Sequence, residues 1–410
     1  MSCIVIMENT MNDDAFADAE EQLRTEIIDT VRRCRKCNYC YSACPLFQST
    51  RGFQTSGPSG IIQSLYYGIV WGELEGQEKE TLRDILYQCT TCNSCVLTCK
   101  DRATGLPIVE VIEKGRKLLV EMMNGPMPSQ RKPMEQIYSH GNPYQEAQEN
   151  RLAWGADLNF KRLPTDEAET LFYVGCTTSY EPELQNVGRS LVKIFQHAGV
   201  DFGVMAEEKC CADPVDKMGD MFLYQEMVEQ NEEAILACGS SRLVTVSPHC
   251  FHTFTQSYDR LTAGMEVLHY TMYLDKLLAD GRLRLQAALP RKITYHDPCY
   301  LGKHHEILEA PRNILRRLPQ VTLVEMEQYG KDSLCCGGGG GRMFYEVEGN
   351  NWLGETRIKQ ALDVKAEIIV TACPWCHTML DNAVKNLGVG GQLQVVELAE
   401  IVAGYLMDAD

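Results

Sequence analysis

Two runs of cysteines near the start of the chain have the spacing of iron–sulfur ligands. Both read Cys-x2-Cys-x2-Cys-x3-Cys; the first comprises Cys34, Cys37, Cys40 and Cys44, and the second comprises Cys89, Cys92, Cys95 and Cys99. In paired runs of this kind, three closely spaced thiolates hold one cluster and the fourth ligates the other cluster. The runs therefore predict two cubane [4Fe–4S] clusters, which carry single electrons. The expected ligands are Cys34, Cys37, Cys40 and Cys99 (quartet I) and Cys89, Cys92, Cys95 and Cys44 (quartet II).

More cysteines recur downstream in two sets with similar spacing. The first set contains Cys176, Cys210, Cys211 and Cys250, and the second contains Cys299, Cys335, Cys336, Cys373 and Cys376. In the first set 33 residues separate Cys176 from Cys210, and in the second 35 residues separate Cys299 from Cys335. The next intervals are 35 residues from Cys211 to Ser247 and 36 residues from Cys336 to Cys373. Spacings that agree this closely indicate a duplication into repeat 1 and repeat 2.

The residues around the duplicated cysteines predict a parallel α/β fold. Apolar runs at 171–174, 243–246 and 368–371 predict buried strands, each ending beside a cysteine or beside Ser247. Helical stripes alternate with these strands: Leu191, Ile194 and Phe195, and less regularly Leu362, Val364 and Ile368. Parallel α/β layers collect ligands beyond the carboxyl ends of their strands. We therefore expect both repeats to present their thiols at such an edge.

The segment with the two N-terminal runs is expected to be helical, because Ile61, Ile62, Leu65 and Ile69 recur at helical spacing in the insert between the runs. The predicted fold class is thus α/β with an all-α part. The expected divisions are a polar leader (1–23), a helical two-cluster ferredoxin-like domain (24–122), a linker (123–167), repeat 1 (168–286) and repeat 2 (287–410).

Composition narrows the function classes. The net charge of −17 over 410 residues argues against nucleic-acid binding, which needs a basic face. The acidic start does not resemble a signal peptide, and no stretch of 18 apolar residues predicts a membrane span. Because 19 cysteines at metal-ligand spacing suit a reducing compartment, we expect a cytoplasmic protein.

One local exception to the acidic character surrounds the first and last N-terminal cysteines. The basic residues there are Arg32, Arg33, Arg35, Lys36, Lys100 and Arg102. They either compensate the negative charge of a cluster or form an electrostatic docking site for an electron-transfer partner. The sequence leaves both interpretations open.

The five cysteines of repeat 2 exceed the four ligands of a structural zinc ion, and the adjacent pair Cys335–Cys336 fits poorly around one tetrahedral ion. The pattern Cys299-x35-Cys335-Cys336-Gly337-x35-Cys373-Pro374-x-Cys376 resembles the CCG domain found in the B and D subunits of heterodisulfide reductase. Two CCG repeats behind a two-cluster domain resemble the D subunit in particular, as do Asn142-Pro143-Tyr144, Arg151 and Trp154 in the linker. Related domains occur in iron–sulfur subunits that serve glycerol-3-phosphate, glycolate and lactate oxidation.

The resemblance implies that Cys299, Cys335, Cys336, Cys373 and Cys376 carry a noncubane [4Fe–4S] cluster that cleaves a disulfide in two one-electron steps. Repeat 1 departs from the pattern, because Ser247 replaces a cysteine and Ala212-Asp213 follows Cys211 where the family has glycine. Its remaining thiols, Cys176, Cys210, Cys211 and Cys250, leave a further cluster open. Lys100 stands where a proline commonly follows the last cysteine of the run.

Some residues near the repeat 2 cysteines have more than one interpretation. The glycine run 337–341 lacks the Lys-Ser/Thr of a phosphate loop and is expected to allow close backbone packing, or to leave room for a substrate. His296, His304, His305 or His377 could donate a proton to a leaving thiolate, and no catalytic residue is assigned. Cys238 belongs to no motif and is expected to be a small buried side chain.

Two functions compete at this stage. The first is an iron–sulfur subunit of a heterodisulfide-reductase-like complex, which exchanges electrons with the repeat 2 site and reduces a disulfide or other small acceptor there. The second is a relay without its own substrate, which links a flavoprotein or dehydrogenase of the 2-hydroxyacid or glycerol-3-phosphate type to a membrane cytochrome b and quinone. The relay would be held at the inner membrane face through its partner. The chain has no flavin or nicotinamide fingerprint, so both functions need other redox subunits.

Overall fold

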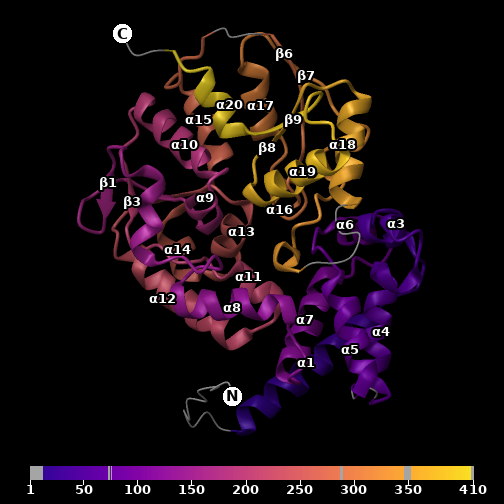
Figure 1. Cartoon of the computed structure of the whole chain (residues 1–410). Coiled ribbons are helices and arrows are strands. Elements are labelled where there is room, and N and C mark those ends of the chain that lie inside the picture. The colour runs from indigo at the N-terminus through magenta and orange to yellow at the C-terminus, as the bar shows by residue number, and fades with distance from the viewer. Residues whose placement is uncertain (1–12, 73, 75, 287–289, 346–351, 408–410) are drawn as a thin grey trace.

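The computed structural model describes residues 13–72, 74, 76–286, 290–345 and 352–407. It contains a helical N-terminal part and two parallel α/β parts that lie side by side (Figure 1). The predicted fold class is confirmed. None of the helices in these ranges is long and apolar enough to cross a membrane.

The N-terminal part is built from helices that bury one apolar face each. Leu23, Ile27 and Val31 of α1 are buried at helical spacing, and α1 packs on α7. The predicted helical insert corresponds to α4 and α5. The helices are α1 (Asp13–Arg32), α2 (Tyr39–Ser42), α3 (Pro45–Ser49), α4 (Pro58–Val70), α5 (Gly76–Tyr87), α6 (Ser94–Arg102) and α7 (Ile108–Glu121), with the 3-10 turn η1 (Gln54–Ser56).

The expected leader and linker contain regular structure. Helix α1 begins at Asp13, inside the expected leader, and residues 1–12 lie outside the described residues. The expected linker, 123–167, holds α8 (Pro128–His140), the 3-10 helix η2 (Gln148–Gly155) and β1 (Lys161–Leu163). Pro128 is at the start of α8, where its missing N–H has no helical partner to lose. Strand β1 joins the sheet of repeat 1.

Repeat 1 forms a five-stranded parallel sheet in the order β1-β3-β2-β4-β5. Its strands are β2 (Thr170–Tyr173), β3 (Phe202–Met205), β4 (Arg242–Thr245) and β5 (Glu266–His269), with Thr170 opposite Arg242. Its helices are α9 (Cys176–Tyr180), α10 (Gln185–His197), α11 (Asp213–Met218), α12 (Met221–Leu236), α13 (Pro248–Ser257), α14 (Asp259–Gly264) and α15 (Tyr270–Ala279).

Repeat 2 forms a four-stranded parallel sheet in the order β7-β6-β8-β9. This order matches β3-β2-β4-β5 strand for strand, which agrees with the duplication. Its strands are β6 (Arg291–Tyr295), β7 (Val321–Leu323), β8 (Ile368–Thr371) and β9 (Gln394–Glu397). Its helices are α16 (Cys299–Gly302), α17 (Glu309–Arg317), α18 (Trp352–Asp363), α19 (Pro374–Leu387) and α20 (Leu398–Gly404), with turns η3 (Gly330–Asp332) and η4 (Arg342–Phe344).

One expected helical stripe in repeat 2 is wrong. Helix α18 ends at Asp363, so Val364 follows the helix, and Ile368 is the first residue of β8. Lys365, at positive φ, turns the chain between the two elements. Three apolar residues at roughly helical spacing therefore spanned a helix, a turn and a strand.

The two repeats share one hydrophobic core. Helix α10 of repeat 1 packs on α20 of repeat 2, and α15 of repeat 1 packs on α17 of repeat 2. Helices α10 and α17 occupy equivalent places, because they follow the equivalent strands β2 and β6. Helices α15 and α20 are likewise equivalent, because they follow β5 and β9. The two contacts are therefore equivalent. The buried hydroxyl of Tyr270 also donates to Glu397 Oε2 across this boundary, at 2.8 Å. The repeats are thus related by an approximate two-fold arrangement.

Candidate iron–sulfur sites

Quartet I surrounds one small hollow near the surface. Cys34 follows α1, Cys37 precedes α2, Cys40 lies on α2, and Cys99 comes from α6, which packs on α2. These four side chains line a cavity of about 20 Å³. Cys37 is exposed, whereas Cys40 and Cys99 are buried. The structure therefore brings together the four cysteines that the spacing assigned to one cluster.

Quartet II surrounds a second hollow of about 20 Å³, deeper in the molecule. Cys44 caps α3, Cys89 and Cys92 lie between α5 and α6, and Cys95 is in the first turn of α6. The backbone N–H of Thr91 donates to Cys89 Sγ at 3.3 Å. Burial raises the pKa of Cys89 to about 11 and also raises that of Cys44, so these thiols ionise only beside a compensating positive charge. The iron ions of a bound cluster would supply such a charge to the thiolates that ligate them.

The five cysteines of repeat 2 meet beyond the carboxyl ends of β6 and β8. Cys299 begins α16, Cys335 and Cys336 precede the glycine run, and Cys373 and Cys376 lie at the start of α19. None of the five is more than 6% exposed. The Sγ atoms of Cys336 and Cys376 are 3.3 Å apart, and the N–H of Gly337 donates to Cys335 Sγ at 3.3 Å.

This five-cysteine set packs against quartet II. Cys92 and Cys335 belong to one buried cluster, and Ser94 and Asn93, beside Cys92, hydrogen-bond with Lys303 of repeat 2. Nearby, the Thr91 hydroxyl is 2.9 Å from the Tyr300 hydroxyl. The sequence placed these residues in separate domains and carried no signal of their contact.

The glycine run lies in the seam between repeat 2 and quartet II. A Cβ at Gly339 would clash with the carbonyl of Thr90, and a Cβ at Gly340 would clash with the carbonyl of Cys89. Gly340 also has φ +65°, which disfavours a side chain. Of the two expected roles of this run, the structure therefore supports close backbone packing.

Arg116, which sequence reasoning missed, joins three parts of the molecule at this seam. Its buried guanidinium donates to the carbonyls of Leu86 and Cys89 in the helical part, Lys217 in repeat 1 and Gly340 in repeat 2. The four partners are backbone oxygens, and no carboxylate among the described residues pairs with Arg116. Its positive charge is thus buried beside Cys89 without a protein counter-ion.

Lys303 is a second buried cation at the same seam, 2% exposed. Its Nζ donates to Ser94 Oγ at 2.6 Å and to the carbonyl of Ser333, and no described carboxylate pairs with it. A buried charge without a counter-ion is expensive unless an anion lies near. Arg116 and Lys303 therefore fit a site that binds anionic groups, as iron–sulfur clusters with thiolate ligands are.

Repeat 1 gathers its four cysteines at the equivalent place. Cys176, Cys210, Cys211 and Cys250 line a cavity of about 30 Å³, close in size to the hollows of quartets I and II. Ser247 also lines this cavity, and its Oγ caps α13 by accepting from the N–H of His249 at 3.2 Å. Ala212 has φ 71°, so repeat 1 keeps the left-handed turn of the Cys-Cys-Gly motif without glycine.

The linker residues singled out in the sequence support this repeat 1 site. Arg151 Nη1 donates to Cys176 Sγ at 3.3 Å and forms a buried ion pair with Glu208. Glu208 in turn accepts from the N–H groups of Val174 and Gly175, which precede Cys176. Pro143 lines the cavity, and Tyr144 donates to Thr177 Oγ1 at 2.9 Å.

Two aromatic rings separate the repeat 1 and repeat 2 sites. His249 and Trp375 occupy equivalent positions in Ser247-Pro-His-Cys250 and Cys373-Pro-Trp-Cys376, and their ring centroids are 4.3 Å apart. His249 also packs on Tyr300 of repeat 2, while Trp375 Nε1 donates to Thr177 of repeat 1 at 3.0 Å. Although burial opposes protonation, Asp213 and Cys373 raise the pKa of His249 to about 10.

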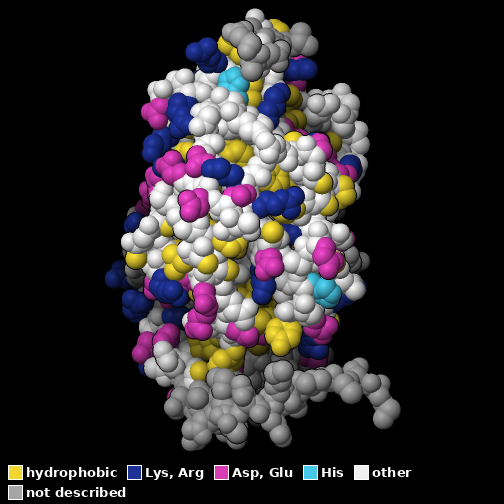
Figure 2. All heavy atoms as spheres, turned by 90° about the vertical axis from the view of Figure 1, so that its left-hand side faces the viewer, with side chains coloured by type: hydrophobic (Ala, Val, Ile, Leu, Met, Phe, Trp, Pro, Cys, Tyr) yellow, Lys and Arg dark blue, Asp and Glu magenta, His cyan; other side chains and the backbone are white. Residues whose placement is uncertain are grey.

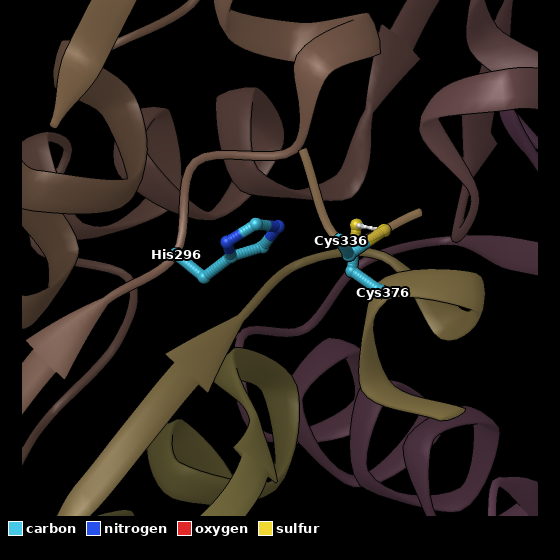
Figure 3. A group of neighbouring side chains, drawn as sticks. All are labelled: His296, Cys336 and Cys376. Carbon is cyan, nitrogen blue, oxygen red and sulfur yellow. Dashed lines mark hydrogen bonds between the residues drawn. The ribbon is translucent and has the colours of Figure 1, made fainter. Parts of the chain in front are cut away.

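The candidate proton donors lie in different places. The imidazole of His296 points toward Cys336 and Cys376, and one ligand atom of each residue lies within 4.8 Å of the others (Figure 3). Burial and the neighbouring Arg357 hold the pKa of His296 well below its usual range, so it is neutral. His304 faces the carbonyl of Thr91, and His305 contacts His252. Burial likewise lowers the pKa of His377.

Comparison with protein-family models matches the three cysteine-rich regions. Residues 30–103 match a 4Fe-4S dicluster domain, and residues 170–255 and 293–381 each match a cysteine-rich domain. The chain is 29% identical over 392 residues to the D subunit of dihydromethanophenazine:CoB–CoM heterodisulfide reductase from Methanosarcina barkeri, covering 91% of this chain and 93% of that protein. The chain thus contains one 4Fe-4S dicluster domain and two cysteine-rich domains, and over nearly its whole length it is similar to this heterodisulfide reductase subunit.

Other relatives of this heterodisulfide reductase-like chain are longer proteins. It is 33% identical over 335 residues to the probable iron-sulfur-binding oxidoreductase FadF of Bacillus subtilis (79% of this chain, 47% of FadF). It is also 33% identical over 358 residues to the EtfAB:quinone oxidoreductase of Syntrophomonas wolfei (83% of this chain, 48% of that protein). The chain thus spans about half the length of these two relatives.

A solved structure supports the fold alone. A hypothetical protein of Helicobacter pylori superimposes with a TM-score of 0.53 at 10% identity, covering 97% of this chain and 76% of that one. The family matches and relatives together show a chain with iron–sulfur-type domains that is similar to iron–sulfur oxidoreductases and to their subunits.

Proposed function

We propose that this chain is the electron-transfer subunit of a heterodisulfide-reductase-like complex and is active only with its partner subunits. Quartets I and II would each hold a cubane [4Fe–4S] cluster, and Cys299, Cys335, Cys336, Cys373 and Cys376 would hold a noncubane one. The clusters supply one-electron oxidation and reduction. Electrons would pass between the surface at quartet I and the repeat 2 site by way of quartet II.

The packing of quartet II against the repeat 2 cysteines carries this proposal. Cys92 of quartet II and Cys335 of repeat 2 belong to one buried cluster, and quartet II also shares α6 with quartet I. Quartet I contains Cys37, the exposed member among the described cysteines. This order from the surface to the interior supports the proposal, because a protein that conducts electrons to a buried site requires it.

The side chains at the seam have definite tasks in this proposal. Lys303 and Arg116 would offset the negative charge of neighbouring clusters, which favours their reduced forms. The N–H groups of Thr91 and Gly337 donate to cysteine sulfur and would also favour the reduced forms of the clusters. The low exposure of the five repeat 2 cysteines keeps water from the site.

We further propose that the repeat 1 cysteines hold a fourth cluster, of the cubane type. The support is their cavity of about 30 Å³, which is as large as those of the two quartets, and the positive charge of Arg151 beside Cys176. Four thiols match the four ligands that a cubane needs. Ser247 acts as a helix cap in this arrangement.

Iron quantitation with EPR spectroscopy on anaerobically prepared protein tests the cluster set. Four clusters predict about 16 iron atoms per chain, from about four in each. A count of about 12 iron atoms would contradict the cluster in repeat 1 and leave the rest of the proposal intact. About eight atoms would contradict the cluster in repeat 2.

A relay without its own substrate is the second candidate. Two observations favour it: the five repeat 2 cysteines are buried, and one relative is named as an EtfAB:quinone oxidoreductase. The chain would then link a flavoprotein or dehydrogenase to a membrane cytochrome b and quinone, and would be held at the inner face of the membrane through that partner. A radical-type EPR signal that appears only with an added thiol would favour disulfide chemistry. No thiol response, with co-purification of a cytochrome b, would favour the relay.

A further inference from the structure

The surface around Cys37 exposes a cysteine of quartet I and carries positive charge without nearby ion-pair partners among the described residues. Cys37 lies among exposed residues, and Arg33, Arg35 and Lys36 beside it are exposed as well. Lys100 and Arg102 extend from the end of α6, next to Cys99 of the same quartet. We call these five cations the quartet I basic patch.

The patch has little negative charge to balance it. Among the described residues, none of the five cations forms an ion pair with a carboxylate; the nearby Arg32 pairs with Asp29 at 3.9 Å. The acidic residue between Lys100 and Arg102 is Asp101. By contrast, the face at the β1 side of repeat 1 shows basic and acidic side chains interspersed (Figure 2). A concentrated patch in a chain of net charge −17 therefore needs an explanation beyond solubility.

A broad hollow lined by aromatic rings, one of them exposed, borders the patch. Its volume is about 760 Å³, and its lining includes Lys36, Asn38, Tyr41, Tyr67 and Trp71. Trp71 is 63% exposed and stacks on Tyr67, whose hydroxyl accepts from Lys36 Nζ at 2.8 Å. Exposed aromatic residues next to basic ones are typical of a protein–protein contact surface.

We propose that the quartet I basic patch and this hollow dock a redox protein that carries its electron-donating group inside an acidic face. The proposal deepens the electron-transfer function and rests on it. An acidic partner is steered to the patch by opposite charge, and docking there brings its redox group next to Cys37. Each encounter moves one electron, so the partner is oxidised by one electron as the chain is reduced by one.

Stopped-flow reduction of the cluster-loaded full chain by reduced flavodoxin, a small acidic flavoprotein, tests the docking. We expect the second-order rate constant to fall as ionic strength rises. The triple variant Arg33→Glu, Arg35→Glu and Arg102→Glu should react at least about tenfold more slowly at low ionic strength and lose the salt dependence. The matched control reverses charges at Arg162 of β1 and at Lys193 and Arg284 of repeat 1 and should stay within about twofold.

Further measurements separate docking from cluster integrity. Iron content and the rate of reduction by dithionite should be the same in the variant and the wild type. If a glutamate beside Cys34 prevents cluster loading, Lys100→Gln with Arg102→Gln tests the other side of the patch and should still slow flavodoxin severalfold. An unchanged flavodoxin rate in a cluster-loaded variant would overturn the docking proposal, whereas failure of dithionite to reduce the wild-type clusters would overturn the electron-transfer function.

A vesicle assay tests whether lipid is the ligand instead. We expect no binding of the full chain to phosphatidylserine-containing vesicles beyond that of the triple variant. Vesicle binding that the triple variant abolishes, together with an unaltered flavodoxin rate, would assign the patch to a membrane surface and contradict the proposal.

Discussion

Repeat 1 and repeat 2 have the same strand order and place their cysteines at the same positions, yet they differ in what surrounds those cysteines. In repeat 2 the fifth thiol, Cys373, is present, and Cys335 lies in one buried cluster with Cys92 of quartet II. In repeat 1 Ser247 takes the place of the fifth thiol and caps a helix, and Arg151 faces Cys176. The duplication thus preserved the scaffold, while the neighbours of each site became specialised.

The source of positive charge shows this specialisation most clearly. Repeat 2 uses Lys303, four residues after Cys299, and Lys303 has no carboxylate partner among the described residues. The equivalent position in repeat 1 is Tyr180, and the charge comes from Arg151 in the linker, stacked over the Tyr180 ring and paired with Glu208. Lys303 thus lacks a carboxylate partner among the described residues, whereas Arg151 has its own counter-ion.

The largest effects are expected when one thiol is removed from the site of each repeat, which tests whether the two sites act separately. Cys336→Ala should lower the iron content by about four atoms and abolish any thiol-dependent EPR signal. Cys211→Ala should also remove about four atoms but leave that signal. Cys238→Ala is the control, because Cys238 is buried and belongs to none of the cysteine sets. Among the described residues, its thiol donates a hydrogen bond to the Ala234 carbonyl alone. Loss of the signal in Cys211→Ala would show that the sites act as one.

A second experiment compares the two buried cations. Arg151→Met leaves Glu208 buried without its partner, so it should lower the free energy of unfolding by about 3–5 kcal/mol. Lys303→Met strands no described carboxylate and should cost less stability, while it lowers the reduction potential of the neighbouring cluster. Chemical denaturation and potentiometric EPR measure the two quantities.

The control for these cation variants is Arg189→Met. It removes an exposed pair with Asp157 and should cost under about 1 kcal/mol. A Lys303→Met variant as unstable as Arg151→Met, with an unchanged potential, would contradict the distinction between the two cations.

A smaller effect is expected at the turn after each cysteine pair. Gly337 has φ +103°, and an added Cβ would meet Leu353 and Met379 only at ordinary contact distance. Gly337→Ala should therefore lower the free energy of unfolding by about 1–2 kcal/mol because of its backbone conformation alone. Ala212 already carries that penalty at φ 71°, and Ala212→Gly should change stability by less than about 1 kcal/mol. Thermal unfolding of both variants checks this; strong destabilisation by Ala212→Gly would mean that its methyl group is needed for packing.

The smallest expected effect is a pair of opposite pH dependences at the last helix of each repeat. Burial lowers the pKa of His269 to about 3, so its contribution to stability is complete above about pH 6.5 and is lost as pH falls toward 3. Burial raises the pKa of Glu397 well above its usual range, so its contribution is complete at acid pH and is lost as pH rises.

The free energy of unfolding, measured across pH, tests the direction of both pH dependences. His269→Gln should flatten the loss of stability on the acid side, and Glu397→Gln should flatten the loss on the alkaline side. The two single variants act as controls for each other, because each should leave the other limb of the profile unchanged. An alkaline change in His269→Gln would contradict the assignment.

Local and periodic features could be predicted from the sequence. The spacing of the cysteines identified the members of each set, and the apolar runs at 243–246 and 368–371 located β4 and β8 to within one residue. The stripe Leu362, Val364 and Ile368 failed because three residues cannot distinguish a helix from a helix followed by a turn and a strand. The helix α8 in the linker escaped notice because its polar, proline-rich sequence has no clear apolar face.

Contacts between distant segments could not be predicted. The placement of Cys92 in one buried cluster with Cys335, the donation of Arg116 to three parts of the chain and the ring contact between His249 and Trp375 all depend on how the parts pack. No single sequence records which buried arginine or lysine will face which backbone carbonyl. The buried cation beside each set of cysteines is therefore known only from the structure.

The reciprocal packing of α10 on α20 and of α15 on α17 bears on how the molecule arose. A protein with only one such repeat would leave the apolar faces of both helices uncovered, and a second identical copy would cover them through a symmetric dimer. Fusion of two gene copies would convert that dimer into the present chain without altering the packing. Once joined, the two halves were free to diverge, since a substitution such as serine at 247 no longer had to appear in both.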